Sequence, residues 1–164
     1  RQLSGTRSIG ARGLHHLVIE RLNERKMTGT ALDDIKIHVK IKLSALWAAV
    51  MFCYVYGDHF RLFQHGALQE MLAGEMWSRP VTQELLVGTS IFITIPAVMV
   101  FLSLILKPKL NRWVNIVLAV TYTAVLLITM RGAWAYYIFL GIVEIALKVL
   151  IVWYAWTWPS QGET

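Results

Sequence analysis

The feature that most constrains this chain is a series of four long apolar segments, at about residues 43–60, 84–106, 112–130 and 133–156. A helix needs about 20 predominantly apolar residues to cross the hydrocarbon core of a bilayer. Charged residues make up only 16% of the chain, against roughly 25% in soluble domains, and they fall mainly between these segments. Lipid offers no hydrogen bonds to an open backbone, so we predict four membrane-spanning helices. The expected fold class is an all-α, integral membrane four-helix bundle.

The segments that connect these spans differ in length. The first connection is the longest, and within it residues 66–74 form a stretch bounded by glycines with one apolar face. We expect a short interfacial helix there, between the first and second spans. Pro96 lies near the middle of the second span, where it removes a backbone hydrogen bond and predicts a kink. Only Arg131 and Gly132 clearly separate the last two spans, which predicts a tight antiparallel hairpin.

The ends of the chain differ from this membrane domain, which we place at residues 35–158. We expect residues 1–34 to be an N-terminal tail that is disordered or, for residues 1–26, not native to the protein. The alternative is a genuine basic tail that lies on anionic lipid. Residues 159–164 are expected to form a C-terminal tail.

The distribution of lysine and arginine predicts the orientation. Lys107, Lys109 and Arg112 lie within six residues between the second and third spans, and several lysines precede the first span. The positive-inside rule then places both termini in the cytoplasm, and the expected location is the bacterial inner (plasma) membrane. The basic residues flank apolar spans and form no separate basic domain, so we exclude nucleic acid as a partner. The expected partners are the lipid bilayer and either further copies of the chain or a larger membrane complex.

The most informative polar residue is Glu144, about 11 residues into the fourth span and hence close to mid-membrane. A charge at that depth costs about 2.5–3.5 kcal/mol on insertion scales. Lys148 lies at i+4 and shares its helix face. One interpretation is an internal ion pair, and the other is a carboxylate that binds a proton or cation. Tyr54 and Tyr122 lie at a similar depth and are candidate hydrogen-bond donors to Glu144, so these four residues form a candidate intramembrane polar site.

A second candidate site lies at the outer mouth, where Asp58, His59 and His65 follow the first span. Aspartate and histidine bind metals or relay protons, but this spacing matches no specific metal motif. A helix end exposed to water is the favoured interpretation, and we expect neither a metal nor a cofactor. The single cysteine, Cys53, excludes an internal disulfide or a Cys-x-x-Cys pair.

Six short motifs lie along the membrane domain: KLSALW at 42–47, YVYGD at 54–58, GALQ at 66–69, IPA at 95–97, LNRW at 110–113 and GAWAYY at 132–137. In these motifs residues 35–158 resemble a family of small uncharacterised bacterial four-helix membrane proteins, classified as a domain of unknown function. The resemblance implies an architecture and no activity. In layout alone, four short spans with an amphipathic piece after the first are similar to DoxX-like proteins.

Three functions remain open, in decreasing order of preference. The first is a structural or accessory membrane protein, or a subunit of a membrane complex. The second is a small proton-coupled transporter that uses Glu144. The third is a membrane enzyme that acts on a lipid or quinone, with Asp58, His59 and Tyr54 at its site. The chain has no phosphate loop, nucleophile elbow or metalloprotease motif, so an enzyme is the least favoured.

Overall fold

The computed structural model describes residues 15–16, 18–21, 36–76 and 79–158. The chain divides into two compact units, residues 1–36 and 37–164. In the first unit the described residues 15–16 and 18–21 are helical and exposed. The rest of the expected N-terminal tail, residues 1–34, and the expected C-terminal tail, residues 159–164, lie outside the described residues.

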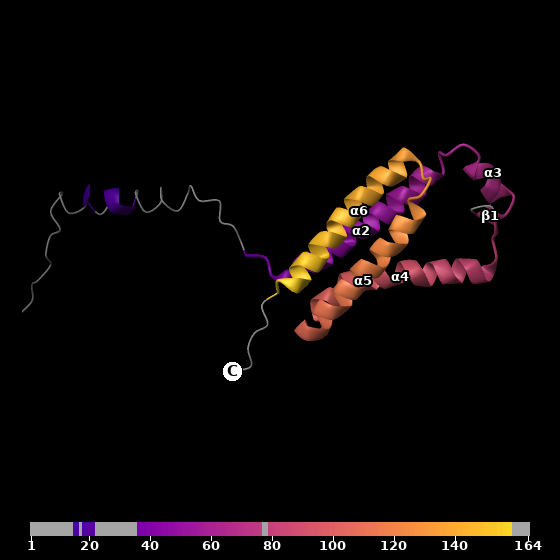
Figure 1. Ribbon diagram of the computed structural model, residues 1–164. Helices are drawn as coiled ribbons and strands as arrows, with labels where there is room; N and C mark the ends of the chain where they lie inside the picture. The colour runs from indigo at the N-terminus through magenta and orange to yellow at the C-terminus, as the bar shows by residue number, and fades with distance from the viewer. Residues whose placement is uncertain (1–14, 17, 22–35, 77–78, 159–164) are drawn as a thin grey trace, which may run out of the picture. The chain divides into compact units, whose positions relative to one another are not determined.

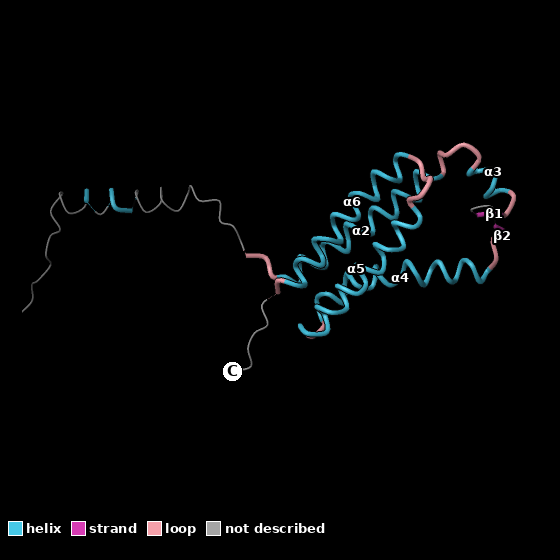
Figure 2. Tube along the Cα trace, in the orientation of Figure 1, coloured by secondary structure: helices cyan, strands magenta, loops and turns pink. Residues whose placement is uncertain are grey.

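The second unit holds four long helices, α2 (Val39–Arg61), α4 (Gln83–Ile105), α5 (Pro108–Thr129) and α6 (Ala135–Trp156) (Figures 1 and 2). Each of them is long and apolar enough to cross a membrane. The helical state expected for the four apolar segments is therefore confirmed.

Two of these helices begin earlier than the sequence predicts. α2 begins at Val39 because the side chain of His38 accepts a hydrogen bond from the backbone N–H of Lys40, at 3.2 Å. α5 begins at Pro108, directly after the end of α4. A proline is favoured in the first turn of a helix, where its missing N–H would have no partner in any case.

The first connection contains the short helix α3 (Ala67–Leu72), followed by two-residue strands β1 (Glu75–Met76) and β2 (Arg79–Pro80). The strands pair antiparallel, which adds a small hairpin to the expected all-α fold. Gly66 and Gly74 flank α3 with φ values of 87° and 73°. Only glycine adopts such angles without strain, so the two glycines set where this helix starts and stops.

The four long helices pack unequally. α2 lies against both α4 and α6, and α6 also lies against α5, whereas α4 and α5 contact each other sparsely. The buried residues of α4 all come from its second half, namely Pro96, Met99 and Ser103. Figure 1 shows the first half of α4 running away from the other three helices.

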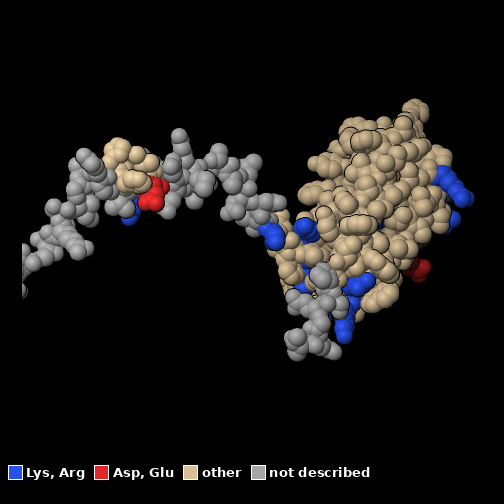
Figure 3. Space-filling model, turned by 60° about the vertical axis from the view of Figure 1, so that its left-hand side comes forward, with Lys and Arg blue, Asp and Glu red and all other residues tan. Residues whose placement is uncertain are grey.

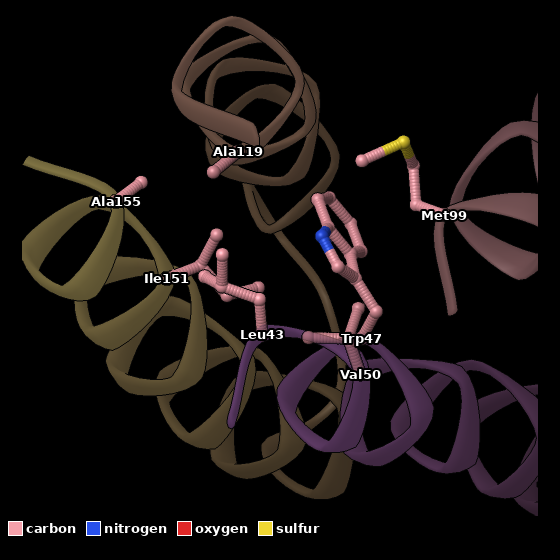
Figure 4. Packing of buried hydrophobic residues seen from close by; sticks show 7 residues of the cluster. All are labelled: Leu43, Trp47, Val50, Met99, Ala119, Ile151 and Ala155. Carbon is pink, nitrogen blue, oxygen red and sulfur yellow. The ribbon is translucent and has the colours of Figure 1, made fainter. Parts of the chain in front are cut away.

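The apolar core joins all four long helices. Trp47 of α2 is fully buried, and its indole points between Ala119 of α5 and Met99 of α4 (Figure 4). The other members of this cluster are Leu43, Val50, Ile151 and Ala155.

The outer surface of the long helices is mostly apolar. Phe52, Phe101 and Phe139 are 63%, 61% and 66% exposed. In the view of Figure 3 the broad face of the helical unit is almost free of charged side chains, which lie near its edges. A soluble domain keeps most of its polar side chains on the surface. Here the outer surface is mostly apolar, and several polar side chains are buried.

A buried chain of hydrogen bonds connects three helices. The indole N–H of Trp47 donates to Oδ1 of Asn115 at 2.6 Å. The amide of Asn115 donates to Oδ1 of Asn111 at 2.6 Å, and the amide of Asn111 donates to the carbonyl of Ser103 at 2.6 Å. The Ser103 carbonyl is one of the last four of α4 and has no partner within its own helix. The asparagines therefore cap α4 and tie it to α2 and α5.

This network gives a testable stability difference. We expect Asn115→Leu, which keeps the number and branching of the side-chain heavy atoms, to lower the free energy of unfolding by about 1–3 kcal/mol, because it leaves the Trp47 N–H buried without an acceptor. The measurement is the loss of helicity by circular dichroism as SDS is titrated into the chain in a mild detergent.

A double-mutant cycle supplies the control. Trp47→Phe should cost less in the Asn115→Leu background than in the wild type, since the indole N–H then has no hydrogen bond to lose. Equal costs in the two backgrounds would show that the hydrogen bond contributes nothing.

Candidate functional site

The candidate intramembrane site lies on the buried face of α6. Glu144 and Lys148 are 4% and 1% exposed, and they share this face with Gly141 and Ile151. The ammonium group of Lys148 donates to Oε1 of Glu144, so the two side chains form an ion pair within one helix. A glutamate four residues before a lysine is the favourable order for such a pair.

Tyrosines from two other helices enclose this pair. The hydroxyl of Tyr54 on α2 hydrogen-bonds to the carboxylate of Glu144. The Lys148 ammonium lies 5.8 Å from the ring centre of Tyr54 and 5.9 Å from that of Tyr122 on α5. Both distances fit cation–π contacts. The structure thus brings together all four residues of the candidate site, from three helices.

The role expected for Tyr122 as a donor to Glu144 is not what the structure shows. Its hydroxyl donates instead to the backbone carbonyl of Phe92 on α4 at 2.6 Å, and the two rings stack 4.5 Å apart. In a regular helix the Phe92 carbonyl would accept the N–H of residue 96, which is a proline and has none. Tyr122 therefore replaces the backbone hydrogen bond that Pro96 removes, and α4 continues through the proline.

The residues of the outer-mouth candidate are placed differently. Asp58 and His59 lie in the last turn of α2 and His65 in the loop before α3, and all three side chains are exposed. The ring of His59 packs edge-on against Phe60 and Phe63. Within residues 36–76 and 79–158 and the short described helix before them, no group of three His, Cys, Asp or Glu side chains is arranged to hold a metal ion.

Two side-chain contacts tie the first connection to the long helices at this end of the structure. Arg61 of α2 forms an ion pair with Glu70 of α3, with 3.6 Å between Nη2 and Oε2. The side-chain amide of Gln64 donates to the hydroxyl of Tyr136 on α6 at 2.7 Å. The pairing of these four residues does not follow from the sequence, because it depends on how the loop folds back over the helices.

The chemistry available to the buried pair follows from its contacts. The carboxylate of Glu144 accepts from Lys148 and Tyr54, and the ammonium of Lys148 lies between two aromatic rings. Each charge is therefore compensated by the protein itself. An open pocket of about 740 Å³ lies along the first half of α4, and none of its lining residues belongs to this cluster; they are Thr82, Gln83, Glu84, Val87, Gly88 and Ile91.

A model described as a family of unknown function (DUF6326) matches residues 34–164. No curated protein and no solved structure matches the chain.

The hydrogen bond from Tyr122 to the Phe92 carbonyl can be tested together with Pro96, which leaves that carbonyl without its backbone donor. We expect Tyr122→Phe to lower the free energy of unfolding by about 0.6–1.7 kcal/mol, the range for hydrogen bonds between membrane helices. In a Pro96→Ala background the same substitution should cost close to nothing, because the alanine N–H then bonds to the Phe92 carbonyl. Thermal unfolding in detergent, followed by circular dichroism, measures both costs, and an equal cost in the two backgrounds would contradict this account.

Proposed function

The chain belongs to DUF6326, a family of unknown function, and we propose that it is a multi-pass membrane protein with a structural or accessory role, such as a subunit of a membrane complex. The observation that carries this proposal is the closed ion pair between Glu144 and Lys148. A buried charge that is compensated internally suits a residue that fixes helix packing. It does not suit one that exchanges protons with water.

Membrane embedding as a four-helix bundle is supported by the polarity of the four long helices. Each is apolar enough to span a bilayer, and their outward faces carry large apolar side chains. We propose that the bilayer is the bacterial inner membrane and that both termini are cytoplasmic. Lys107 in the turn between α4 and α5, with Lys109 and Arg112 at the start of α5, supports that orientation.

The transporter alternative requires Glu144 to reach water in at least one state. In this structure its side chain is almost fully buried, and two partners already occupy its carboxylate. The enzyme alternative requires Asp58, His59 and Tyr54 to act together. Tyr54 bonds to Glu144, whereas Asp58 and His59 are exposed at the end of α2. Neither alternative gains an observation in its favour.

A structural role for the pair gives a sharp stability prediction. Lys148→Met and Glu144→Gln should each lower the free energy of unfolding by about 3 kcal/mol, since either one leaves a buried partner uncompensated. The double variant should be more stable than either single one, because no buried charge remains. SDS titration followed by circular dichroism measures all three.

A matched control and a transport assay complete this test. Glu84→Gln makes the same chemical change at an exposed position at the start of α4 and should change stability by less than about 0.5 kcal/mol. In vesicles containing a pH-sensitive dye, the wild type and the folded double variant should acidify at the same rate as empty vesicles. If the wild type takes up protons and the double variant does not, the structural role is contradicted and the transporter is favoured.

The proposed orientation is tested by cysteine labelling. With Cys53 replaced by serine, Lys107→Cys should resist a membrane-impermeant maleimide in intact bacterial cells and react after lysis. Arg131→Cys, in the turn at the opposite end of α5, should react in intact cells. Labelling of position 107 in intact cells would reverse the assignment.

A further inference from the structure

The short helix α3 presents an apolar face of its own, outside the four long helices. Leu68, Met71 and Leu72 are 54%, 38% and 82% exposed. They are spaced three and four residues apart, so they lie on one face of the helix. We call these three residues the apolar face of α3. Apolar side chains that are exposed side by side mark a surface that contacts a partner or a membrane.

A different side of α3 is attached to the long helices. Ala67 is buried, and Glu70, three residues later, forms the ion pair with Arg61 at the end of α2. Just before α3, the side-chain amide of Gln64 donates to the hydroxyl of Tyr136 on α6. These contacts fix α3 beside the end of α2, and the exposed leucines take no part in them.

The level at which α3 is attached carries aromatic residues. Phe60 in the last turn of α2 and Tyr136 in the first turn of α6 have ring centres 5.9 Å apart. Trp134, the N-cap residue of α6, is exposed. Aromatic side chains at the ends of membrane spans are typical of the headgroup level. An apolar helix face at that level suits the boundary between headgroups and acyl chains.

α3 is also coupled to the start of α4. The backbone N–H of Val81 donates to the carbonyl of Gly74 at 2.8 Å, which closes the β1–β2 hairpin between the two helices. The next residue, Thr82, caps α4 by accepting from the N–H of Leu85 at 3.2 Å. The first half of α4 contains no buried residue. The position of its start therefore depends on the first connection more than on packing against the other long helices.

We propose that the apolar face of α3 inserts into the bilayer at the boundary between headgroups and acyl chains, and that this anchor holds the first half of α4 in place. A lipid surface is the favoured occupant because α3 is attached at the level of the aromatic residues, where lipid surrounds the spans. The sequence predicts an interfacial helix at residues 66–74, and the contacts add the side chains that enter the lipid and the helix that they position. This inference rests on the membrane embedding proposed above.

Fluorescence quenching tests the insertion. The full chain, with Cys53 replaced by serine, carries a fluorescent label on one introduced cysteine and is reconstituted into phosphatidylcholine vesicles. A label at Leu72→Cys should lose most of its fluorescence to a lipid spin-labelled high on its acyl chain, since an interfacial helix enters the bilayer by about 5–10 Å. Iodide in the water should quench it little. Gln69→Cys, exposed on the same helix but outside the apolar face, should show the reverse.

A distance measurement tests the effect on α4. Spin labels at Tyr56→Cys on α2 and Val87→Cys on α4, both exposed positions, should give a narrow distance distribution by pulsed electron paramagnetic resonance in the same vesicles. Replacing Leu68 and Leu72 together by glutamine should broaden it, because α3 then loses its hold on the lipid. The control Gln69→Ala should leave the distribution unchanged. A distribution that stays narrow in the double variant would overturn the positioning of α4.

The quenching outcomes separate the anchor from other occupants. Equal quenching of positions 69 and 72 by iodide would overturn it. Protection of position 72 from both quenchers would overturn it as well, and would show that protein covers the leucines. A label at Phe52→Cys, exposed near the middle of α2, tests the proposed function separately. It should be quenched by a lipid spin-labelled at the end of its acyl chain. Failure there contradicts membrane embedding, whereas quenching at position 52 without quenching at position 72 overturns only the present inference.

Discussion

Hydrogen bonds from side chains to the backbone carbonyls of α4 hold this structure together. Tyr122 and Asn111 of α5 donate to the carbonyls of Phe92 and Ser103. Ser44 and Lys40 of α2 donate to those of Val100 and Leu104. α4 packs against α2 but contacts α5 sparsely, so its attachment to α5 depends on the bonds of Tyr122 and Asn111. Apolar side chains gain little by leaving lipid for one another, which makes polar contacts the specific ones between membrane helices.

The buried ion pair performs the same task for α6. Its partners come from α2 and α5, so the position of α6 along its axis and its rotation are both constrained by Tyr54 and Tyr122. Buried ion pairs are weak sources of net stability, but polar groups of this kind can fix one arrangement among several. Because α6 is apolar on its other faces, hydropathy alone does not determine which face points inward. Glu144 and Lys148 mark the buried face.

The sequence predicts the features that depend on local spacing. The four helices follow from hydropathy, the shared helix face of Glu144 and Lys148 from an i,i+4 spacing, and the similar depth of Tyr54 and Tyr122 from counting along the spans. The spacing leaves open whether Glu144 pairs with Lys148 or binds a proton or cation. Depth alone does not give helix rotation, however, so it does not distinguish Glu144 from the Phe92 carbonyl as the partner of the Tyr122 hydroxyl. The sequence does not predict the hydrogen bond from Asn111 to the Ser103 carbonyl either, because a residue pattern does not show which backbone carbonyls lack a partner. For the bond between Tyr122 and Phe92 the sequence does offer a signal, which is Pro96. A proline inside a helix leaves the carbonyl four residues earlier without its backbone donor.

The carbonyl bonds of α4 also bear on the order in which the protein is made. The donors on α2 precede α4 in the chain, whereas Asn111 and Tyr122 are synthesised after it. When α4 leaves the ribosome, the carbonyls of Phe92 and Ser103 consequently have no permanent partner until α5 arrives. The short turn at Leu106 and Lys107 shortens that interval by delivering Asn111 within a few residues. α4 and α5 are thus best regarded as one folding unit, which joins α2 as a pair.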